Sequence, residues 1–204
     1  VEAEDLDYHS VFLVEHHFTG FGQVSASLNL LTYLAARTQR MRLGTAVVVL
    51  PWHNPVLLAE QAATVDLLSG GRLDFGVGKG YRANEFHGFN VKADEAQELF
   101  LESLEVIRRA WRSEERFTHI GKHWTFQDIV VEPPPIQRPH PPLWLAAGSE
   151  EGLNWAAQNE FNLLLDQIAS FDIIQQRFAT YRTAVETTGR VFDPMNVAVA
   201  RALH

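Results

Sequence analysis

Apolar runs and helical patterns alternate along the chain. Short runs rich in Val and Leu are each followed by a longer stretch whose apolar residues recur at helical spacing. This alternation is typical of a parallel sheet with crossover helices, because the strands of such a sheet are buried on both faces. The sequence therefore predicts an α/β fold made of repeated strand–helix units.

The predicted strands are apolar runs that end in polar or glycine-containing segments. They cover residues 10–14, about 41–50, 73–77, 143–147, 162–165 and 197–200. The predicted helices follow all of these strands except the last, and they cover residues 28–36, 55–68, 95–111, 150–158 and 171–187. Asn54 and Pro55 supply an N-cap and a first helical residue for the helix 55–68.

Residues 114–142 interrupt this alternation of strands and helices. Phe117, Trp124 and Phe126 indicate a short hairpin, which is followed by the proline-rich stretch 133–142. We interpret the segment as an excursion from a single domain that covers residues 1–204.

Two architectures are compatible with this pattern, a (β/α)8 barrel and a doubly wound open sheet. A closed barrel needs eight strands and typically about 250 residues, whereas this chain has 204 residues. The chain begins without methionine and ends on a predicted strand, so the barrel interpretation implies a partial barrel that is incomplete at both ends. Strand count alone leaves both architectures open.

Composition and charge narrow the classes of function. The chain is 46% hydrophobic, carries a net charge of -8 and contains no cysteine. Nucleic acid binding needs a concentrated surface of lysine and arginine, so the acidic balance argues against it. The apolar runs are too short to cross a bilayer and no basic leader opens the chain, so we expect a cytoplasmic protein without a membrane partner. Cysteine ligands are excluded, and His119 and His123 lie in a segment that is not convincingly helical, so we expect no metal site.

A carboxylate and two histidines follow the first predicted strand. In a (β/α)8 barrel, the side chains after the strand ends face the active site. Glu15, His16 and His17 would lie at this edge, and an imidazole can accept or return a proton near neutral pH. A histidine that only hydrogen-bonds a loop carbonyl would give the same sequence.

Two further strand ends are suited to an anion. Residues 78–80 read Gly-Lys-Gly, so main-chain N–H groups and a lysine charge could hold a phosphate, although a tight turn also accounts for the glycines. Gly148, Ser149 and Gly152 lie where a strand meets a helix, whose first-turn N–H groups bind anions, although a plain N-cap also accounts for the serine. Together with the histidines, these segments place an acid–base group and two anion sites at one edge. A phosphorylated cofactor with a reactive ring requires this combination.

The residues at these strand ends resemble the bacterial luciferase superfamily of flavin-dependent monooxygenases. The similar segments occur in order along nearly the whole chain, and they cover residues 14–22, 44–51, 55–60, 71–76, 139–149 and 155–157. They include Val-Glu-His-His-Phe-Thr-Gly-Phe-Gly at the first strand end and Gly-Thr-Ala-Val-Val-Val-Leu-Pro at the second. The resemblance favours the barrel over the open sheet.

The resemblance implies roles for residues of the first two strand ends. His16 matches the family's active-site histidine beside the flavin, which is credited with proton handling around the peroxyflavin, and His17 is its neighbour. Ala46 and Val47 match a dipeptide that is joined by a cis peptide bond and supports the isoalloxazine ring.

The resemblance also implies a phosphate site, with two departures from luciferase itself. Lys79 matches a phosphate-binding arginine, and Gly148, Ser149 and Gly152 match the phosphate-binding turn between strand and helix. Luciferase has a carboxylate at the position of Gly148 and a reactive cysteine at the position of Gly78. We therefore do not expect light emission, and the resemblance does not identify the substrate.

The activity implied by the resemblance is oxygenation of a small organic substrate. Reduced FMN, supplied by a separate flavin reductase, would react with O2 to form a peroxyflavin that oxygenates this substrate. The family's habit of packing its early helices across a two-fold axis implies a homodimer. Two alternatives share the fold: a deazaflavin-dependent oxidoreductase and a non-catalytic flavin-binding subunit.

Overall fold

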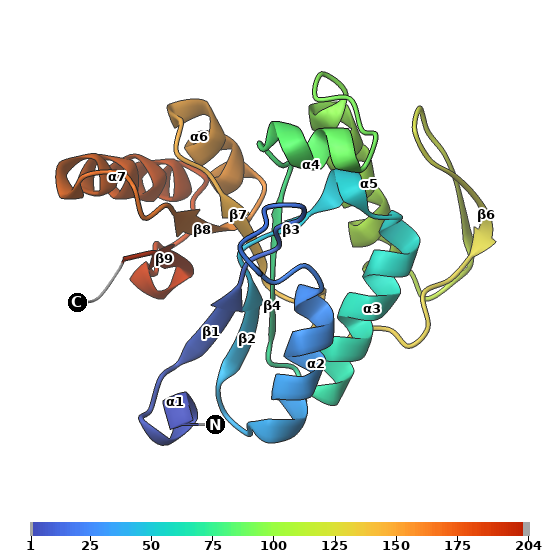
Figure 1. Ribbon diagram of the computed structural model, residues 1–204, viewed down its shortest axis with the longest axis horizontal. Helices are drawn as coiled ribbons and strands as arrows, with labels where there is room; N and C mark the ends of the chain where they lie inside the picture. Colours follow the sequence, from blue (N-terminus) through green and yellow to red (C-terminus); the bar gives the residue numbers. More distant parts are fainter. Residues whose placement is uncertain (1, 202–204) are drawn as a thin grey trace. The chain divides into compact units, whose positions relative to one another are not determined.

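The computed structural model describes residues 2–201, which form two compact units that divide between Pro141 and Pro142. Each unit combines parallel strands with helices (Figure 1). These units confirm the parallel α/β organisation predicted from the alternation of strands and helices. None of the helices within residues 2–201 is both long and apolar enough to cross a membrane. That residues 1–204 form a single domain stays a prediction.

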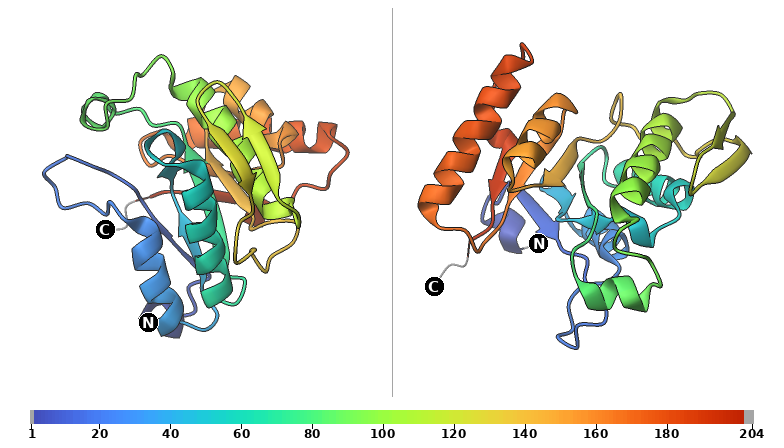
Figure 2. Two further views of the ribbon diagram at one scale, coloured as in Figure 1. Left: turned by 90° about the vertical axis from the view of Figure 1, so that its right-hand side faces the viewer. Right: turned by 90° about the horizontal axis from the view of Figure 1, so that it is seen from above.

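The first unit contains a parallel sheet, a hairpin and most of the helices. Its helices are α1 (Glu2–Asp5), α2 (Ser27–Arg37), α3 (Pro55–Leu68), α4 (Ala83–Gly88) and α5 (Ala96–Arg112), with the 3-10 turn η1 (Leu50–Trp52). Its strands are β1 (Ser10–Leu13), β2 (Arg42–Thr45), β3 (Val48–Val49), β4 (Leu73–Gly78), β5 (Phe117–Ile120) and β6 (Thr125–Ile129). The parallel strands have the order β1-β2-β4, and β3 also pairs with β4. Figure 2 shows α2 and α3 side by side, and α3 also packs against α5.

Apolar side chains from these helices and strands form the core of the first unit. The largest fully buried ones are Leu31, Leu43, Leu50, Leu58, Leu73, Phe75, Ile107 and Trp111. The indole N–H of Trp111 donates to the carbonyl of Ala59 on α3 at 2.9 Å, because a buried indole needs an acceptor. The apolar stripe predicted for residues 95–111 therefore faces the core, and it joins α5 to α3.

Residues 71–76, one of the segments that resemble the luciferase superfamily, fasten the start of β4 to α2. The Arg72 guanidinium donates to the carbonyl oxygens of Ala35 and Thr38 at 3.0 Å. The last carbonyls of a helix have no partner within the helix, so a cation at this end stabilises it. Arg72, although it belongs to a segment that resembles the family, therefore has a structural role: it holds β4 against the end of α2.

The prediction of one continuous strand at about residues 41–50 is wrong. The structure divides the run into β2 and β3, and Ala46 and Val47 lie between them, joined by the cis peptide bond that the resemblance implied. β3 then pairs with β4, with Val48 opposite Val77. Because the residues on both sides of the break are apolar, the hydrophobic pattern does not reveal it.

Residues 114–142 contain the predicted hairpin, formed by β5 and β6 in antiparallel pairing. Glu102 on α5 anchors it, because its carboxylate accepts from the ring of His119 and from the main-chain N–H groups of His123 and Trp124. Figure 2 shows the hairpin beside α5. Within residues 2–201, no group of three or more His, Asp or Glu side chains is arranged to hold a metal ion.

The second unit contains a parallel sheet in the order β7-β8-β9 and two helices that pack against each other. The strands are β7 (Leu143–Ala146), β8 (Asn162–Leu165) and β9 (Val197–Val199), and the helices are α6 (Glu150–Gln158) and α7 (Phe171–Thr187), with the 3-10 turn η2 (Pro194–Asn196). Ser149 and Ser170 cap the two helices with their side-chain oxygens. The predicted helices 150–158 and 171–187 are confirmed, as is the strand 162–165.

The buried carboxylate of Glu4 ties α1 to the segment before β2. It accepts the main-chain N–H groups of Gln39, Arg40 and Met41 at distances of 2.9, 2.6 and 2.8 Å. Hydrogen bonds to a carboxylate favour its charged form. Those from Met41, Arg40 and Gln39 accordingly lower the pKa of Glu4 to about 2.

We predict that Glu4 stabilises the fold at neutral pH and that this contribution is lost in acid. The pKa of the carboxyl falls from 4.5 to about 2 on folding, so the contribution is complete above pH 4.5 and disappears as the pH falls toward 2. In urea unfolding of the full-length protein, Glu4→Gln should lower the free energy of unfolding at pH 7 and approach wild type toward pH 2. Glu2→Gln, at an exposed position of α1, is the matched control. An equal loss at both pH values would contradict the prediction.

Candidate functional site

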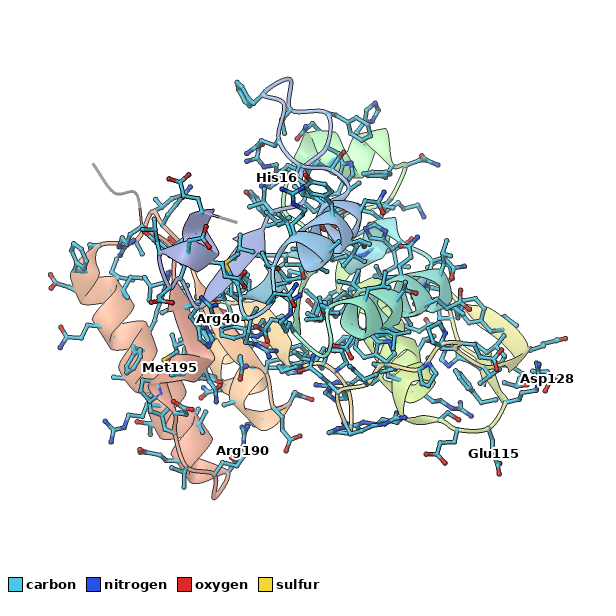
Figure 3. The ribbon with its side chains drawn as sticks, turned by 90° about the horizontal axis from the view of Figure 1, so that it is seen from below. His16, Arg40, Glu115, Asp128, Arg190 and Met195 are labelled. Atoms are coloured by element: carbon cyan, nitrogen blue, oxygen red, sulfur yellow. The ribbon has the colours of Figure 1, made fainter. Side chains whose placement is uncertain are left out.

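The loop that follows β1 carries the first predicted site residues, His16 and His17. The main-chain N–H of His16 donates to the carbonyl of Val24 at 2.9 Å, which closes the loop. Because β1, β2 and β4 are parallel, this loop lies at the edge formed by their carboxyl ends. Figure 3 labels His16, which lies in this loop on the side of α4.

Glu85 on α4 binds both histidines of the loop. Its Oε1 lies 3.0 Å from Nδ1 of His16, and it accepts the main-chain N–H of His17 at 2.9 Å. The residue is only 1% exposed. Next to it, the side-chain amide of Asn84 donates to the carbonyls of His17 and Phe18. Glu85 was not among the predicted site residues, because the hydrophobic pattern predicts no helix at α4.

A second buried carboxylate, Glu15, lies beneath the same loop. Its Oε1 accepts from Nε2 of His17 at 2.9 Å and from Nε2 of His53 at 2.7 Å, and its Oε2 accepts the N–H of Val49 at 2.8 Å. Burial raises the pKa of Glu15, but the hydrogen bonds from His53, His17 and Val49 outweigh this effect, so the pKa lies below its ordinary value. The carboxylate is therefore ionised at neutral pH and joins the loop to the segment that contains β3.

A group of aromatic rings lies next to His17. The ring of His17 meets the edge of Phe89 at 4.7 Å between centroids, and Phe89 stacks on Trp52 at 5.3 Å. The indole N–H of Trp52 is buried and has no hydrogen-bond partner within residues 2–201. A buried donor without a partner costs about 1–3 kcal/mol. Gly80, whose φ is +80°, lets this ring approach, because a Cβ there would come within 2.9 Å of it.

Ala46 and Val47 form a small apolar surface at the carboxyl end of β2. Both are partly exposed, although the strand residues on either side of them are buried. Gly78 at the end of β4 leaves room for this surface, because a Cβ there would lie 2.7 Å from a methyl group of Val47. Lys79 follows directly, and its exposed Nζ donates to Oε1 of Gln97 at 3.2 Å.

In the second unit, Gly148, Ser149 and Gly152 form the turn between β7 and α6. The Ser149 hydroxyl accepts the N–H of Gly152 at 3.2 Å, which is the arrangement of an N-cap. Within the described residues this hydroxyl only accepts, so its proton is available for another acceptor. The turn therefore combines a helix N-terminus with a hydroxyl group, and that it binds an anion stays a prediction.

The guanidinium of Arg177, which was not among the predicted site residues, lies beside this turn. A Cβ on Gly148 would come within 2.8 Å of the guanidinium carbon of Arg177, which extends from α7. Asp166, which follows β8, holds this arginine through a hydrogen bond of 2.5 Å from Nη1 to its Oδ2. The hydrogen bonds from Ala169, Ile168 and Arg177 hold the pKa of Asp166 below its ordinary value, although burial opposes them.

A second guanidinium of this unit binds the main chain of the same segment, residues 166–169. Arg201, which follows β9, donates to the main-chain oxygens of Asp166 and Ala169. The segment after β8 thus binds Arg177 through the carboxylate of Asp166 and Arg201 through main-chain carbonyls. The resemblance to luciferase did not indicate either arginine.

The predicted site residues fall into two sets, one in each unit. His16, His17, Ala46, Val47 and Lys79 follow the carboxyl ends of β1, β2 and β4 in the first unit. Gly148, Ser149 and Gly152 follow the carboxyl end of β7 in the second unit. That the two sets line one cavity stays a prediction.

Known proteins are similar to this chain in sequence and in fold. The family model described as luciferase-like monooxygenase matches residues 1–204. The oxygenase component of a flavin-dependent trigonelline monooxygenase from Acinetobacter baylyi is 32% identical over 76% of this chain and 43% of its own length. The chain spans about half the length of the curated relatives it matches.

Two solved structures have a similar fold. The monooxygenase RslO1 from Streptomyces bottropensis is 32% identical, with a TM-score of 0.89 over 97% of this chain and 60% of its own. The oxygenating constituent of 3,6-diketocamphane monooxygenase from Pseudomonas putida, solved in complex with FMN, has a TM-score of 0.87 over 97% of this chain and 58% of its own. Its identity of 19% makes it a likeness of fold alone.

We predict that removing the carboxylate of Glu15 destabilises the protein. In Glu15→Ala, the N–H of Val49 and the two imidazoles lose their buried acceptor, and the free energy of unfolding should fall by on the order of 3 kcal/mol. Urea unfolding at pH 7 measures this loss. Glu60→Ala on the partly exposed side of α3 is the control, with an expected change within about 0.5 kcal/mol. Similar losses in the two variants would show that the carboxylate does not hold the loop.

Proposed function

We propose, from the premise that this chain belongs to the luciferase-like monooxygenase family, that the full-length protein is a flavin-dependent monooxygenase. It uses reduced FMN and O2 to oxygenate a small organic substrate. The observation that carries the proposal is the imidazole of His16, held by the buried Glu85 at the strand edge that also presents the apolar surface of Ala46 and Val47.

The residues present fit FMN. The partly exposed Ala46 and Val47, with no side chain at Gly78, offer an apolar surface for a flat ring. In the second unit, the first turn of α6 and the Arg177 guanidinium supply the N–H donors and the positive charge that a phosphate needs. The fit therefore covers both the ring and the phosphate of the cofactor.

Each group of residues has one task in this proposal. Reduced FMN supplies the electrons that activate O2, so that one oxygen atom enters the substrate and the other leaves as water. His16, with His17 as its neighbour, holds and returns the proton that this chemistry needs. Lys79, Ser149 and Arg177 bind the phosphate, and the rings of Trp52 and Phe89 keep water away from the histidines.

The proposal extends to the architecture and partners of the full-length protein. We propose that the parallel strand–helix units belong to a (β/α)8 barrel, whose active sites lie at the carboxyl ends of the strands. A separate flavin reductase supplies the reduced cofactor. A homodimer would cover the exposed apolar side chains Leu30, Tyr33 and Leu57 on α2 and α3.

We predict that His16→Ala abolishes most of the turnover while FMN still binds. A general acid–base group contributes about 10²- to 10⁴-fold to a rate, so the rate of product formation should fall at least on the order of 10²-fold. The assay combines full-length protein, a flavin reductase, NADH and FMN with candidate aldehydes, ketones and sulfonates, and it detects the oxygenated product. His87→Ala, at an exposed position of α4, is the control.

Three outcomes of this assay would count against the proposal. Failure to bind FMN or its reduced form at any workable concentration would remove the cofactor, and tighter binding of a deazaflavin would favour the alternative oxidoreductase. Binding without turnover in the wild type would favour a non-catalytic flavin-binding subunit.

We predict that Arg177 distinguishes FMN from riboflavin, which lacks the phosphate. Replacing Arg177 by Gln removes a charged partner of the phosphate, and loss of a charge-assisted hydrogen bond of about 1.5–3 kcal/mol corresponds to a Kd for FMN weakened by roughly 10- to 100-fold. The Kd for riboflavin should stay nearly unchanged. Equilibrium titrations of the full-length protein with both flavins measure the difference.

Arg182→Gln is the matched control, because Arg182 lies on the same helix and pairs with Glu186. It should leave both constants unchanged. Equal weakening of FMN and riboflavin in Arg177→Gln would show that the arginine supports the fold rather than the phosphate.

A further inference from the structure

We infer that Glu85 is the positioning residue of His16: it keeps the ring proton on Nδ1 and thereby leaves Nε2 as the nitrogen that accepts and returns a proton. This inference rests on the proposed function, in which His16 handles the proton. It adds which nitrogen acts and which residue fixes it.

The oxygen of Glu85 that faces the ring acts as an acceptor. Oε1 accepts the main-chain N–H of His17 at 2.9 Å, and this donor cannot be reversed. Nδ1 of His16 lies 3.0 Å from the same oxygen. The hydrogen bond from the ring therefore runs from Nδ1 to Oε1, and a neutral imidazole with its proton on Nδ1 has its lone pair on Nε2.

The surroundings hold this arrangement and leave Nε2 accessible. The side chain of Glu85 is 2% exposed and that of His16 is 15% exposed, so the hydrogen bond between them is shielded while part of the ring stays open. Within residues 2–201, Nε2 of His16 has no hydrogen-bond partner. The ring of Tyr81 meets the imidazole edge to face at 6.3 Å between centroids. A shielded hydrogen bond resists exchange with water and so keeps the tautomer fixed.

His17 is held in the opposite way. Its Nε2 lies 2.9 Å from Oε1 of Glu15, which also receives Nε2 of His53. An ionised carboxylate only accepts hydrogen bonds, so both rings carry a proton on Nε2. The nitrogen that is open in His16 is therefore occupied in His17. Glu85 thus binds His16 through Nδ1, and Glu15 binds His17 through Nε2. Of the two rings, His16 is therefore the one whose Nε2 can accept and return a proton.

The ring protons can be observed directly by ¹⁵N NMR of the full-length protein labelled at histidine. The signals of His16 are assigned by their loss in His16→Asn. In the wild type, we expect Nδ1 of neutral His16 to be protonated and Nε2 to be unprotonated, whereas neutral His17 and His53 should be protonated on Nε2. His16 protonated on Nε2 in the wild type would overturn the inference without any variant.

Three variants separate positioning from a general effect on the loop. Glu85→Gln should keep the tautomer of His16. The main-chain N–H of His17 requires the amide oxygen of the glutamine to face it, and this oxygen can also accept the proton on Nδ1 of His16. Glu85→Met removes the acceptor, so the proton should distribute over both ring nitrogens. Asn84→Ala removes the neighbouring loop contacts without touching the ring of His16, and it should keep the tautomer. A mixed tautomer in Asn84→Ala, or an unchanged one in Glu85→Met, would contradict the inference.

Turnover provides a second, independent readout. We expect Glu85→Gln to lose less than about 10-fold in rate and Glu85→Met to lose on the order of 10²-fold, as His16→Ala does. Full activity in Glu85→Met would overturn the positioning role. If the wild type shows no turnover, the proposed function fails, but the tautomer of His16 still tests the inference.

Discussion

Two buried carboxylates hold the loop after β1, and the rest of the candidate site depends on this hold. Glu85 binds the loop from α4, and Glu15 binds it from beneath through His17 and His53. Burying a carboxylate is costly unless donors surround it, and here imidazoles and main-chain N–H groups supply them. The same contacts that make the burial of charge tolerable also set the orientation of the imidazoles. One set of contacts therefore serves both the stability of the loop and the orientation of the imidazoles.

The sequence predicted which strand ends carry the polar residues but not how these residues pair. His16 and His17 follow an apolar run, so their place at the edge of the sheet follows from the hydrophobic pattern. Glu85 lies 69 residues from His16 and belongs to a short helix without a strong apolar stripe. Arg177 lies in the middle of α7, where an arginine resembles any other charged residue of a helix surface. Contacts between residues distant in sequence leave no local signal in one sequence.

The longer helices were predicted more accurately than the short helix α4 and the irregular backbone. The cap at Asn54 located the start of α3, and apolar residues at helical spacing located the other predicted helices, because these signals act over a few neighbouring residues. The interruption at Ala46 and Val47 lies within an apolar run, so hydrophobicity alone predicted one strand there. The resemblance to the luciferase superfamily supplied the cis bond, and the structure explains the neighbouring Gly78 by its contact with Val47. Family likeness was thus most informative where the physical signal was weakest.

The proposed function requires residues of both units to bind a single mononucleotide, and this stays a prediction. A crystal structure of the full-length protein with FMN tests this most directly. We expect the isoalloxazine ring on Ala46 and Val47 with Nε2 of His16 facing it, and the phosphate at Ser149 beside the Arg177 guanidinium. A flavin bound elsewhere, or a structure in which His16 and Ser149 open onto separate surfaces, would contradict it.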